Sequence, residues 1–433
     1  MVNRIMNVLL LIGSILIYLS FGIKNFIFIL FSILTAYIAA RLFKKKYKKT
    51  ILITTIVLNA AILIFIRFLP ITKNIFTQIN TLNILIPLGI SYYSLQVISY
   101  LIDVYKGKYK AEKNIFNYFL CITYLPHLFI GPISKYNEIK QEFLDKNGLS
   151  WNNLGNGFVR ILWGLLKKLV IAGRIAIVIA SISGNPEIYN GWYVLLAIFL
   201  YSIQLYSDFS GGIDIVLGIS TIFGINLIEN FDSPYYSESI KEFWRRWHIS
   251  LGRWLKDYIY IPLGGNRCGK KRQAINLLIT FLVSGIWHGV NFILWGVLHG
   301  IFVIFDDNYK TPFKWLNRVI NFIIVSFLWS FFIWDSTVTA IAMIGSVFMN
   351  FNIVNVSTNI LNLGIKLGDW IVLIIFGSVL FVFDGNKVKI ISKIKNLSPE
   401  LKTTFVCILI LIIIIFGIYG IGFDVNEFIY SKF

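Results

Sequence analysis

The chain has 433 residues, of which 57% are hydrophobic and only 14% are charged. Together with a mean hydropathy of +0.73, this composition excludes an ordinary soluble domain and predicts a polytopic membrane protein. The formal net charge of +19 does not indicate nucleic-acid binding, because basic residues accumulate in the cytoplasmic loops of membrane proteins.

A helix needs about 20 apolar residues to cross a bilayer. Such runs predict an all-α protein with about ten or eleven membrane spans, some of them buried or re-entrant rather than spanning. They lie at 5–22, 26–40, 51–69, 82–102, 115–131, 157–182, 191–223, 274–304, 318–348, 369–384 and 402–422. The stretches 191–223 and 274–304 could each be one tilted helix, or a helix plus a re-entrant piece.

Four basic clusters predict cytoplasmic loops by the positive-inside rule; they lie at 41–49, 106–113, 270–272 and 387–395. Two apolar runs and the Lys-poor loop 70–81 separate the first two clusters, which places the N-terminus on the cytoplasmic side. A second interpretation is that these basic faces bind anionic lipid or an acidic cytoplasmic partner.

The run YSIQLYSDFSGGID (201–214) places Asp208 and Asp214 inside an apolar stretch. Two carboxylates at membrane depth are costly unless they are paired. We expect their partners among three basic residues of the next charged segment, Arg245, Arg246 and Lys256. A structural ion pair is the favoured interpretation, and the alternative is that Asp208 orients a histidine.

The segment 232–273 combines charged residues with tryptophans, a pattern typical of a helix at the membrane interface or dipping into it. Within one continuous helix, Trp244 and His248 are four residues apart and share a face. Pro262 and the glycines that follow it are expected to end this helix.

The segment 276–304 is predicted to be one helix through the membrane. On such a helix His288, Asn291, Trp295 and His299 form a single stripe, with the two histidines about 16 Å apart along the axis. A polar stripe on an apolar helix must face the protein interior or a water-filled path.

His288 is the stronger catalytic candidate of the four histidines. A neutral imidazole near pH 7 can take a proton from a hydroxyl that attacks an acyl carbonyl, and ionisable residues inside a membrane are functional by default. His248 follows two arginines, which disfavour its protonation; it could bind the acyl donor, orient the acceptor or hold its segment in place. For His127 and His299 we favour a structural role.

Five sequence blocks resemble the bacterial membrane-bound O-acyltransferases (the MBOAT family) and follow the family's order; they span 87–107, 124–139, 201–225, 229–267 and 285–300. The WRRWH and WHG segments are shared across the bacterial branches, whereas the ending YIPLGGNR is similar to the alginate and cell-surface polysaccharide O-acetyltransferase branch. Ser207 and Gly212 stand where the family often has aromatic residues, so the substrate funnel could differ.

The resemblance implies one membrane domain over residues 1–433, with its core motifs at 201–300 and a ring of helices around a central tunnel. It implies His288 as the catalytic histidine, acting as general base or acyl relay, and His248 as the second family histidine. Seven residues are expected to line the tunnel or contact the substrate: Trp287, Asn291, Trp295, Arg245, Arg246, Trp247 and Asp208. No metal or cofactor is expected beyond an acyl thioester co-substrate such as acetyl-CoA.

The implied activity is acyl transfer in the plasma membrane of a bacterium. An acyl group, most simply acetyl, would move from a cytoplasmic thioester to a hydroxyl of an extracytoplasmic cell-surface polysaccharide, or of a secreted or anchored esterase-like acetyltransferase partner. The alternative is D-alanyl transfer from a carrier protein to teichoic acid, although that branch usually lacks the YIPLGGNR ending. A transporter is the alternative of another class, but the internal repeats that transporters often show are not visible in the sequence.

Overall fold

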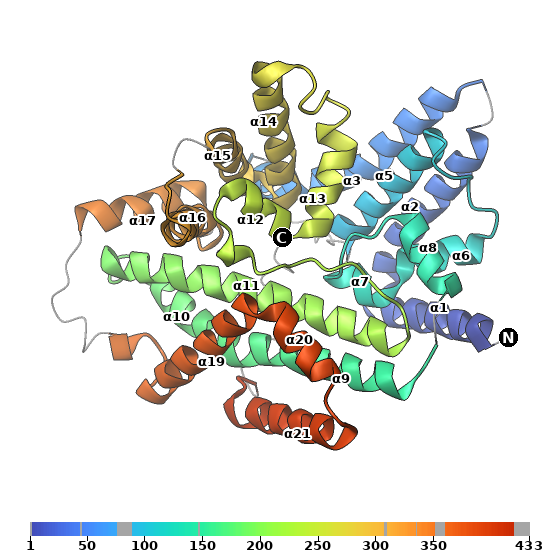
Figure 1. Cartoon of the computed structure of the whole chain (residues 1–433). Helices are drawn as coiled ribbons and strands as arrows, with labels where there is room; N and C mark the ends of the chain where they lie inside the picture. Colours follow the sequence, from blue (N-terminus) through green and yellow to red (C-terminus); the bar gives the residue numbers. More distant parts are fainter. Residues whose placement is uncertain are drawn as a thin grey trace.

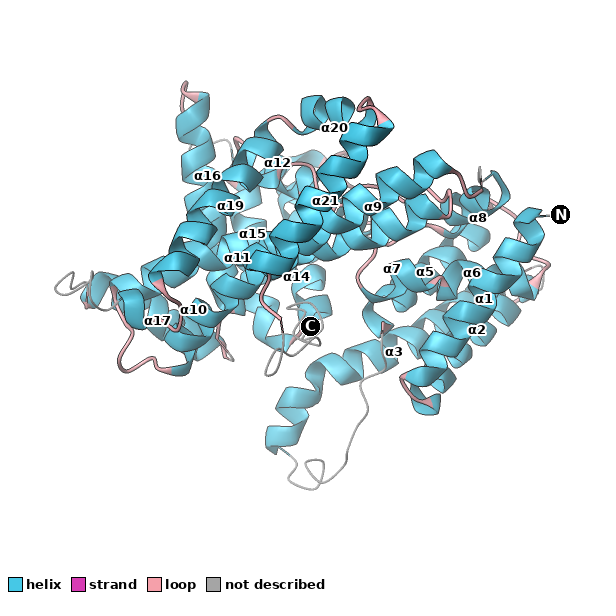
Figure 2. Cartoon of the chain, turned by 90° about the horizontal axis from the view of Figure 1, so that it is seen from below, coloured by secondary structure: helices cyan, strands magenta, loops and turns pink. Residues whose placement is uncertain are grey.

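The computed structural model describes residues 2–43, 46–75, 89–145, 148–306, 310–334, 336–350 and 360–419. Figures 1 and 2 show that this part of the chain is built of helices. Its single β-type pairing is an isolated antiparallel bridge between Phe231 and Trp247. The predicted all-α architecture is confirmed.

The N-terminal helices pack into a group of their own, coloured blue to teal in Figure 1. Within it α2, α3 and α5 pack on one another, and α1 packs on α6. The core of this group also takes in Trp254, Tyr258 and Trp287 from later in the chain. The helices are α1 (Val2–Ser20), α2 (Ile23–Leu42), α3 (Lys48–Ile75), α5 (Ile90–Tyr105), α6 (Ile115–Thr123), α7 (Leu125–Phe129) and α8 (Tyr136–Asp145).

A second apolar core surrounds the long helix α11 (Trp192–Ile222), which crosses the molecule in Figure 1. Its neighbours in the structure are α9, the π-helix η1, α10, α16 and α17, and α19 and α21 add further apolar side chains to this core. The bounds are α9 (Trp151–Leu165), η1 (Leu166–Ala172), α10 (Gly173–Gly184), α16 (Lys314–Trp329), α17 (Thr337–Met349), α19 (Leu367–Gly385), α20 (Lys387–Lys395) and α21 (Pro399–Phe416).

Glycines allow α9 and α11 to touch backbone to backbone. A Cβ atom on Gly164 would lie 2.5 Å from the carbonyl oxygen of Gly211, and one on Gly157 would lie 2.6 Å from that of Gly218. Small residues are the usual means of close helix approach in a membrane, where no hydrophobic force holds apolar helices together. The stretch 191–223 therefore forms one long helix clamped along its length.

Six helices of the described chain are long and apolar enough to cross a bilayer, and three shorter apolar helices lie at Ile5–Ser20, Val290–Ile304 and Thr337–Met349. The protein is a multi-pass membrane protein. Several expected spans are divided into pieces; residues 115–131, for example, form α6 and α7, and part of 82–102 lies outside the described residues. The ring of helices around a tunnel stays a prediction.

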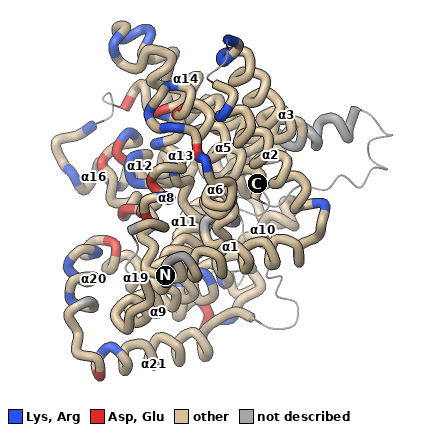
Figure 3. Tube along the Cα trace, turned by 90° about the vertical axis from the view of Figure 1, so that its right-hand side faces the viewer, with Lys and Arg blue, Asp and Glu red and all other residues tan. Residues whose placement is uncertain are grey.

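Charged residues gather in the shorter elements. Figure 3 shows them around α8, α20, α12 (Ile240–Arg246) and α13 (Ile249–Leu255) and at the start of α14 (Gly269–His288), while the long helices are mostly uncharged. Of the basic clusters that were expected in loops, 106–113 lies in a loop, whereas 270–272 forms the first turn of α14 and 387–395 forms the short helix α20. Which side of the membrane these loops face stays a prediction.

The prediction of one helix over 276–304 is wrong. Helix α14 (Gly269–His288) ends at His288, a short 3-10 helix follows at Val290–Phe292, and α15 (Ile293–Ile304) then packs back against α14. The chain turns at Gly289, whose φ of 136° is open to glycine but strained for other residues. Glycines let the two helices approach, because a Cβ atom on Gly285 would lie 2.6 Å from the Phe292 carbonyl oxygen.

The prediction of one continuous interfacial helix through His248 is also wrong. The segment consists of α12 (Ile240–Arg246), α13 (Ile249–Leu255) and a π-helical turn, η3 (Lys256–Tyr260). Ser239 caps α12 by accepting a hydrogen bond from the Glu242 backbone N–H. Between α12 and α13, Trp247 is extended and His248 is left-handed, so Trp244 and His248 do not share a helix face.

Gly296→Ala should destabilise the protein by about 1–3 kcal/mol, the usual cost of forcing an extra carbon into a packed interior. A Cβ atom at this position would overlap the Phe281 carbonyl oxygen and crowd Gly285. Thermal unfolding in detergent measures the change. The matched control is Gly377→Ala, since Gly377 has open space around its Cα and alanine favours helix. Equal stability of the two variants would contradict the close contact between α14 and α15.

Candidate active site

The two candidate catalytic histidines meet at one indole ring. Trp287 lies 4.6 Å from His288 and 6.3 Å from His248, measured between ring centroids. The Trp287 indole N–H donates to the Ser91 carbonyl oxygen at 3.2 Å, which ties it to α5 of the N-terminal group. The structure therefore brings together two residues that the sequence places forty positions apart.

His288 occupies the C-terminal end of α14 and is buried. Besides Trp287, its imidazole contacts Trp295 at 5.2 Å and Phe332 at 5.7 Å, each in an edge-to-face arrangement. Apolar rings on several sides exclude bulk water, which strengthens hydrogen bonds and charge interactions at this imidazole.

His248 is held in an unusual backbone conformation, with a φ of 45°. Non-glycine residues avoid this region unless the surrounding structure enforces it, and such residues cluster at functional sites. Here Asn230 supplies the constraint. Its carbonyl oxygen accepts from the Ile249 N–H at 3.0 Å, and its side-chain Oδ1 accepts from the Ser250 N–H at 2.9 Å.

The hydrogen bonds of Asn230 are part of a set of contacts that hold the two ends of the loop 231–247 together; we call this set the closed base of the loop. Phe231 and Trp247 form the antiparallel bridge, and the Asp232 N–H donates to the Arg246 carbonyl oxygen at 3.0 Å. The His248 ring projects to Phe209 on α11, at 4.9 Å between centroids. This loop therefore places His248 against the second apolar core, whereas Trp287 on its other side belongs to the first.

A cluster of aromatic rings surrounds His288 and joins it to His299. Trp295 contacts both histidines, at 5.2 Å from His288 and 4.9 Å from His299. The Trp244 indole N–H donates to Nδ1 of His299 at 3.2 Å, and Trp329 lies against Trp295 at 5.6 Å. His299 thus packs within this cluster, and its contacts agree with the structural role favoured for it.

Other expected site residues lie at different distances from the cluster. Trp247 is buried, and its ring packs against that of Trp329 at 5.0 Å in a tilted arrangement. Arg245 is exposed, while Arg246 pairs with Glu242 at 2.6 Å. Asn291 lies in the 3-10 turn after His288, where its carbonyl oxygen accepts from Thr337. Their assignment to a tunnel wall stays a prediction.

The prediction that Arg245, Arg246 or Lys256 pairs with the buried carboxylates is wrong. Asp208 pairs with Lys168 at 2.6 Å, and Asp214 pairs with Lys167 at 2.6 Å and with Arg160 at 3.0 Å. The cause is the wide turn of η1, which brings two consecutive lysines to α11. π-Helical turns of this kind insert a residue into a helix and re-aim the side chains around it.

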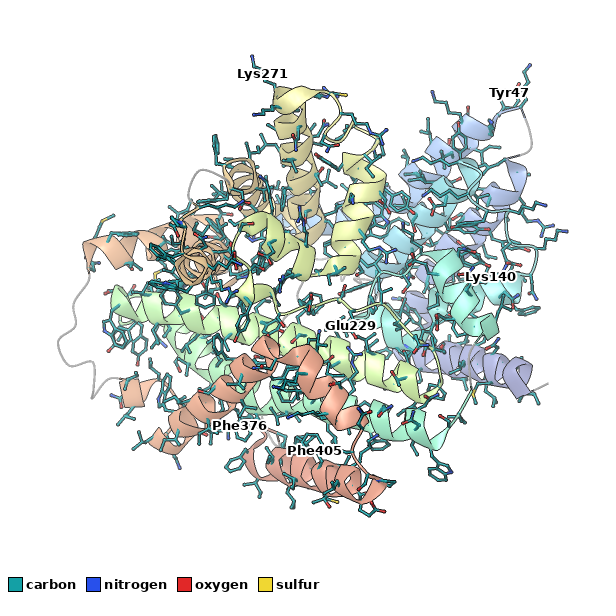
Figure 4. All side chains as sticks on the ribbon, viewed as in Figure 1. Tyr47, Lys140, Glu229, Lys271, Phe376 and Phe405 are labelled. Carbon is teal, nitrogen blue, oxygen red and sulfur yellow. The ribbon has the colours of Figure 1, made fainter. Side chains whose placement is uncertain are left out.

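This ion-pair network reaches the loop that carries Asn230. Arg160 also pairs with Glu229 at 2.7 Å, and Figure 4 labels Glu229 on the connection that crosses α11. The carboxylates therefore stabilise the frame around His248. The favoured interpretation of a structural ion pair agrees with these contacts.

Two ion pairs join the block around Pro132 to α13 and η3. Lys135 contacts Asp257 at 2.5 Å, and Arg253 contacts Glu138 at 2.5 Å. The Ile133 N–H donates to Ser250 Oγ at 3.0 Å, two residues after His248. A half-open pocket of about 260 Å³ lies beside this junction, and its lining mixes polar side chains such as Arg253, Glu138 and Asn226 with the apolar Leu227 and Ile228.

Comparison with known proteins identifies the part of the chain that holds these residues. Residues 112–314 match the model of the membrane-bound O-acyltransferase family, MBOAT. Residues 112–314 form an MBOAT domain. The resemblance stated from the sequence blocks is confirmed, and the matched region contains His248, His288 and their aromatic neighbours.

Curated relatives of the MBOAT domain act on cell-surface polymers, according to their names. The chain is 38% identical to a probable alginate O-acetylase AlgI of Pseudomonas syringae pv. tomato, over 61% of this chain and 52% of that protein. It is 34% identical to a peptidoglycan O-acetyltransferase of Helicobacter pylori, over 66% and 62%. A teichoic acid D-alanyltransferase of Bacillus subtilis is 28% identical, over 54% and 63%. The chain thus spans about half to three fifths of the length of these relatives.

Sequence reasoning missed three parts of this MBOAT site. Asn230 lies in a sequence block that carries the resemblance, but no motif marks its role as a clamp. The paired lysines in GLLKKLV (164–170) interrupt an apolar run, and that charge was the available signal for partners of Asp208 and Asp214. Trp329 and Phe332 come from a run without polar pattern, so only the packing reveals them.

Asn230→Ala should lower the free energy of unfolding by about 1–3 kcal/mol, because it leaves the buried Ser250 N–H without its acceptor. It should also reduce activity, since His248 loses part of the clamp that holds its left-handed backbone. Unfolding and acyl transfer in detergent are the measurements. Asn190→Ala is the control, at a half-buried asparagine whose side-chain hydrogen bond to the Glu187 carbonyl oxygen is exposed. Unchanged stability and activity of Asn230→Ala would contradict the clamp.

Asp214→Asn should destabilise the protein by about 3–5 kcal/mol, because it leaves the buried Lys167 ammonium without its carboxylate. Glu238→Gln, which breaks a more exposed pair with Arg318 at 3.2 Å, should change stability by about 1 kcal/mol or less. Thermal unfolding of the two variants side by side checks the difference. If Glu238→Gln cost as much as Asp214→Asn, burial would not be the reason for the effect.

Proposed function

We propose that the chain is a membrane O-acyltransferase of a bacterial plasma membrane. It moves an acyl group, most simply acetyl, from a cytoplasmic thioester such as acetyl-CoA to an extracytoplasmic hydroxyl. The acceptor is a cell-surface polysaccharide or a secreted or anchored esterase-like acetyltransferase that passes the group on. The observation that carries the proposal is the meeting of His288 and His248 at Trp287, inside the region that matches the MBOAT family.

In the proposed reaction, His288 takes the proton of the acceptor hydroxyl as its oxygen attacks the acyl carbon. The carbon–sulfur bond of the thioester breaks, and the imidazolium returns the proton to the departing thiolate. Burial among Trp287, Trp295 and Phe332 supports this role, because it keeps competing water from the acyl carbon. His248 assists by placing the donor and does not carry the transferred proton.

Acetyl is favoured over D-alanyl as the acyl group. The support is the higher identity to the alginate and peptidoglycan relatives, at 38% and 34%, than to the teichoic acid relative, at 28%. The YIPLGGNR sequence at 260–267 agrees with this choice. Transport without chemistry does not account for a buried histidine pair within an acyltransferase domain.

His288→Ala should lower the rate of acetyl transfer by at least about 100-fold, as loss of a general base does. The assay uses purified protein in liposomes with radiolabelled acetyl-CoA, and alginate oligomers and muropeptide fragments as acceptors in turn. Trp151→Ala, at a tryptophan that is 88% exposed, is the control for handling and reconstitution.

Unimpaired transfer by a folded His288→Ala protein would overturn the catalytic assignment. Label transfer only from a D-alanyl-loaded carrier protein, and not from acetyl-CoA, would replace acetyl by D-alanyl. Label transfer from neither donor by the wild-type protein, with both acceptor types present, would count against acyltransferase activity on these polymers.

A further inference from the structure

Two buried N–H groups on α15 have no acceptor in the described part of the protein. They are Nε1 of Trp295 and Nε2 of His299, and both side chains are fully buried. Buried polar groups nearly always have a hydrogen-bond partner, and an exception calls for a specific explanation such as a ligand.

The proton on His299 is fixed by its neighbour. The Trp244 indole can only donate, and it donates to Nδ1 of His299 at 3.2 Å. Because Nδ1 accepts, a neutral imidazole must carry its proton on Nε2. His299 is therefore held as a hydrogen-bond donor, just as Trp295 is a donor by its chemistry.

The two donors are neighbours, and Trp295 lies between His299 and His288. Trp295 and His299 are four residues apart on α15 and share a helix face, with their rings 4.9 Å apart. Trp295 also contacts His288 at 5.2 Å. The glycine contacts between α14 and α15 hold these three side chains in a fixed relation, because Gly296 follows Trp295 and packs on Gly285, three residues before His288.

We propose that Trp295 Nε1–H and His299 Nε2–H bind the carbonyl oxygen of the acyl group that is transferred. This inference rests on the proposed acyltransferase function. When the acceptor oxygen bonds to the acyl carbon, the carbonyl electrons move to the oxygen, and the two donors stabilise that negative charge. The carbonyl re-forms as the carbon–sulfur bond breaks, and the sulfur takes the proton that His288 removed.

The proposal separates two tasks within the cluster. His288 moves the proton, whereas Trp295 and His299 contribute preorganised N–H groups in a site that apolar rings shield from water. Trp244 is then a positioning residue, since it acts by holding the tautomer and orientation of His299 and does not touch the acyl group.

The test measures the acyl carbonyl directly. A methyl ketone analogue of acetyl-CoA, labelled with ¹³C at its carbonyl, cannot transfer its acyl group but presents the same oxygen. Hydrogen bonding lowers the carbonyl stretching frequency in isotope-edited infrared spectra. We expect a lowered band in the wild-type protein and a band nearer the unbonded position in Trp295→Phe and in His299→Leu.

The same variants should lose about 10²–10³-fold in kcat, the usual effect of removing one donor to an oxyanion, with a smaller change in KM. His299→Gln should recover part of this loss, because a glutamine amide can accept from Trp244 and donate with its own N–H. Trp315→Phe is the matched control at a tryptophan that is 66% exposed, and it should match the wild type.

A wild-type band at the unbonded position overturns the proposal without any variant, which covers the case that a variant fails to fold. An unchanged band and an unchanged kcat in both Trp295→Phe and His299→Leu overturn it as well. If His288→Ala abolishes acetyl transfer while these results are negative, the acyltransferase function stands and only the carbonyl site fails. If the wild-type protein neither transfers acetyl nor binds the analogue, the proposed function fails first.

Discussion

The backbone contact between α14 and α15 fixes the geometry on which the rest of the site depends. Two helices can lie this close only where glycine replaces a side chain, and Gly285, Gly296 and Gly300 do so in succession. The contact between α14 and α15 ends at the turn through Gly289, and this turn leaves His288 among the aromatic rings of the cluster. A hydrogen bond would flex with its side chains, whereas a steric contact of this kind defines a distance.

The site lies where two apolar cores meet. Trp287 packs with the N-terminal helices, whereas Trp247 and Trp295 pack with the helices around α11. His248 lies between Trp287 and Phe209, so it contacts both sides. Any shift of one helix group against the other changes the surroundings of both histidines at once. The ion pairs Lys135–Asp257 and Arg253–Glu138 fasten the segment that follows His248 to the N-terminal group.

Much of this architecture was predictable because composition and motif order carry it. Membrane character, all-α structure and the choice of His248 and His288 as candidates follow from hydropathy and from the sequence blocks, whereas their meeting at Trp287 comes from the structure. The ends of the helices at Gly289 and His248 could not be predicted from the sequence. The helical spacing of apolar residues does not indicate that distant partners force a residue into left-handed backbone. Nor could the period reveal that Lys167 and Lys168 turn toward α11, since a π-helical turn is set by packing.

The carbonyl donors illustrate a different limit of sequence reasoning. A histidine within an apolar helix looks like a packing residue, and His299 does pack against Trp244 and Phe281. The tautomer of His299 depends on which of its ring nitrogens accepts the hydrogen bond from Trp244, and only the folded structure determines that. Sequence can place a histidine near a site, but only the hydrogen bond from Trp244 defines what the histidine presents to it.

The closed base beneath the loop 231–247 has a consequence for how such a protein can change. Asn230 and the Phe231–Trp247 bridge hold the two ends of the loop together, and His248 follows directly after it. The backbone of the histidine is therefore fixed at the neck of the loop. Inside the loop, Ile240 and Phe243 are fully buried, and Phe243 packs against Trp247 at 5.5 Å. Substitutions are therefore better tolerated at partly exposed loop positions such as Tyr236 and Lys241 than at these buried ones.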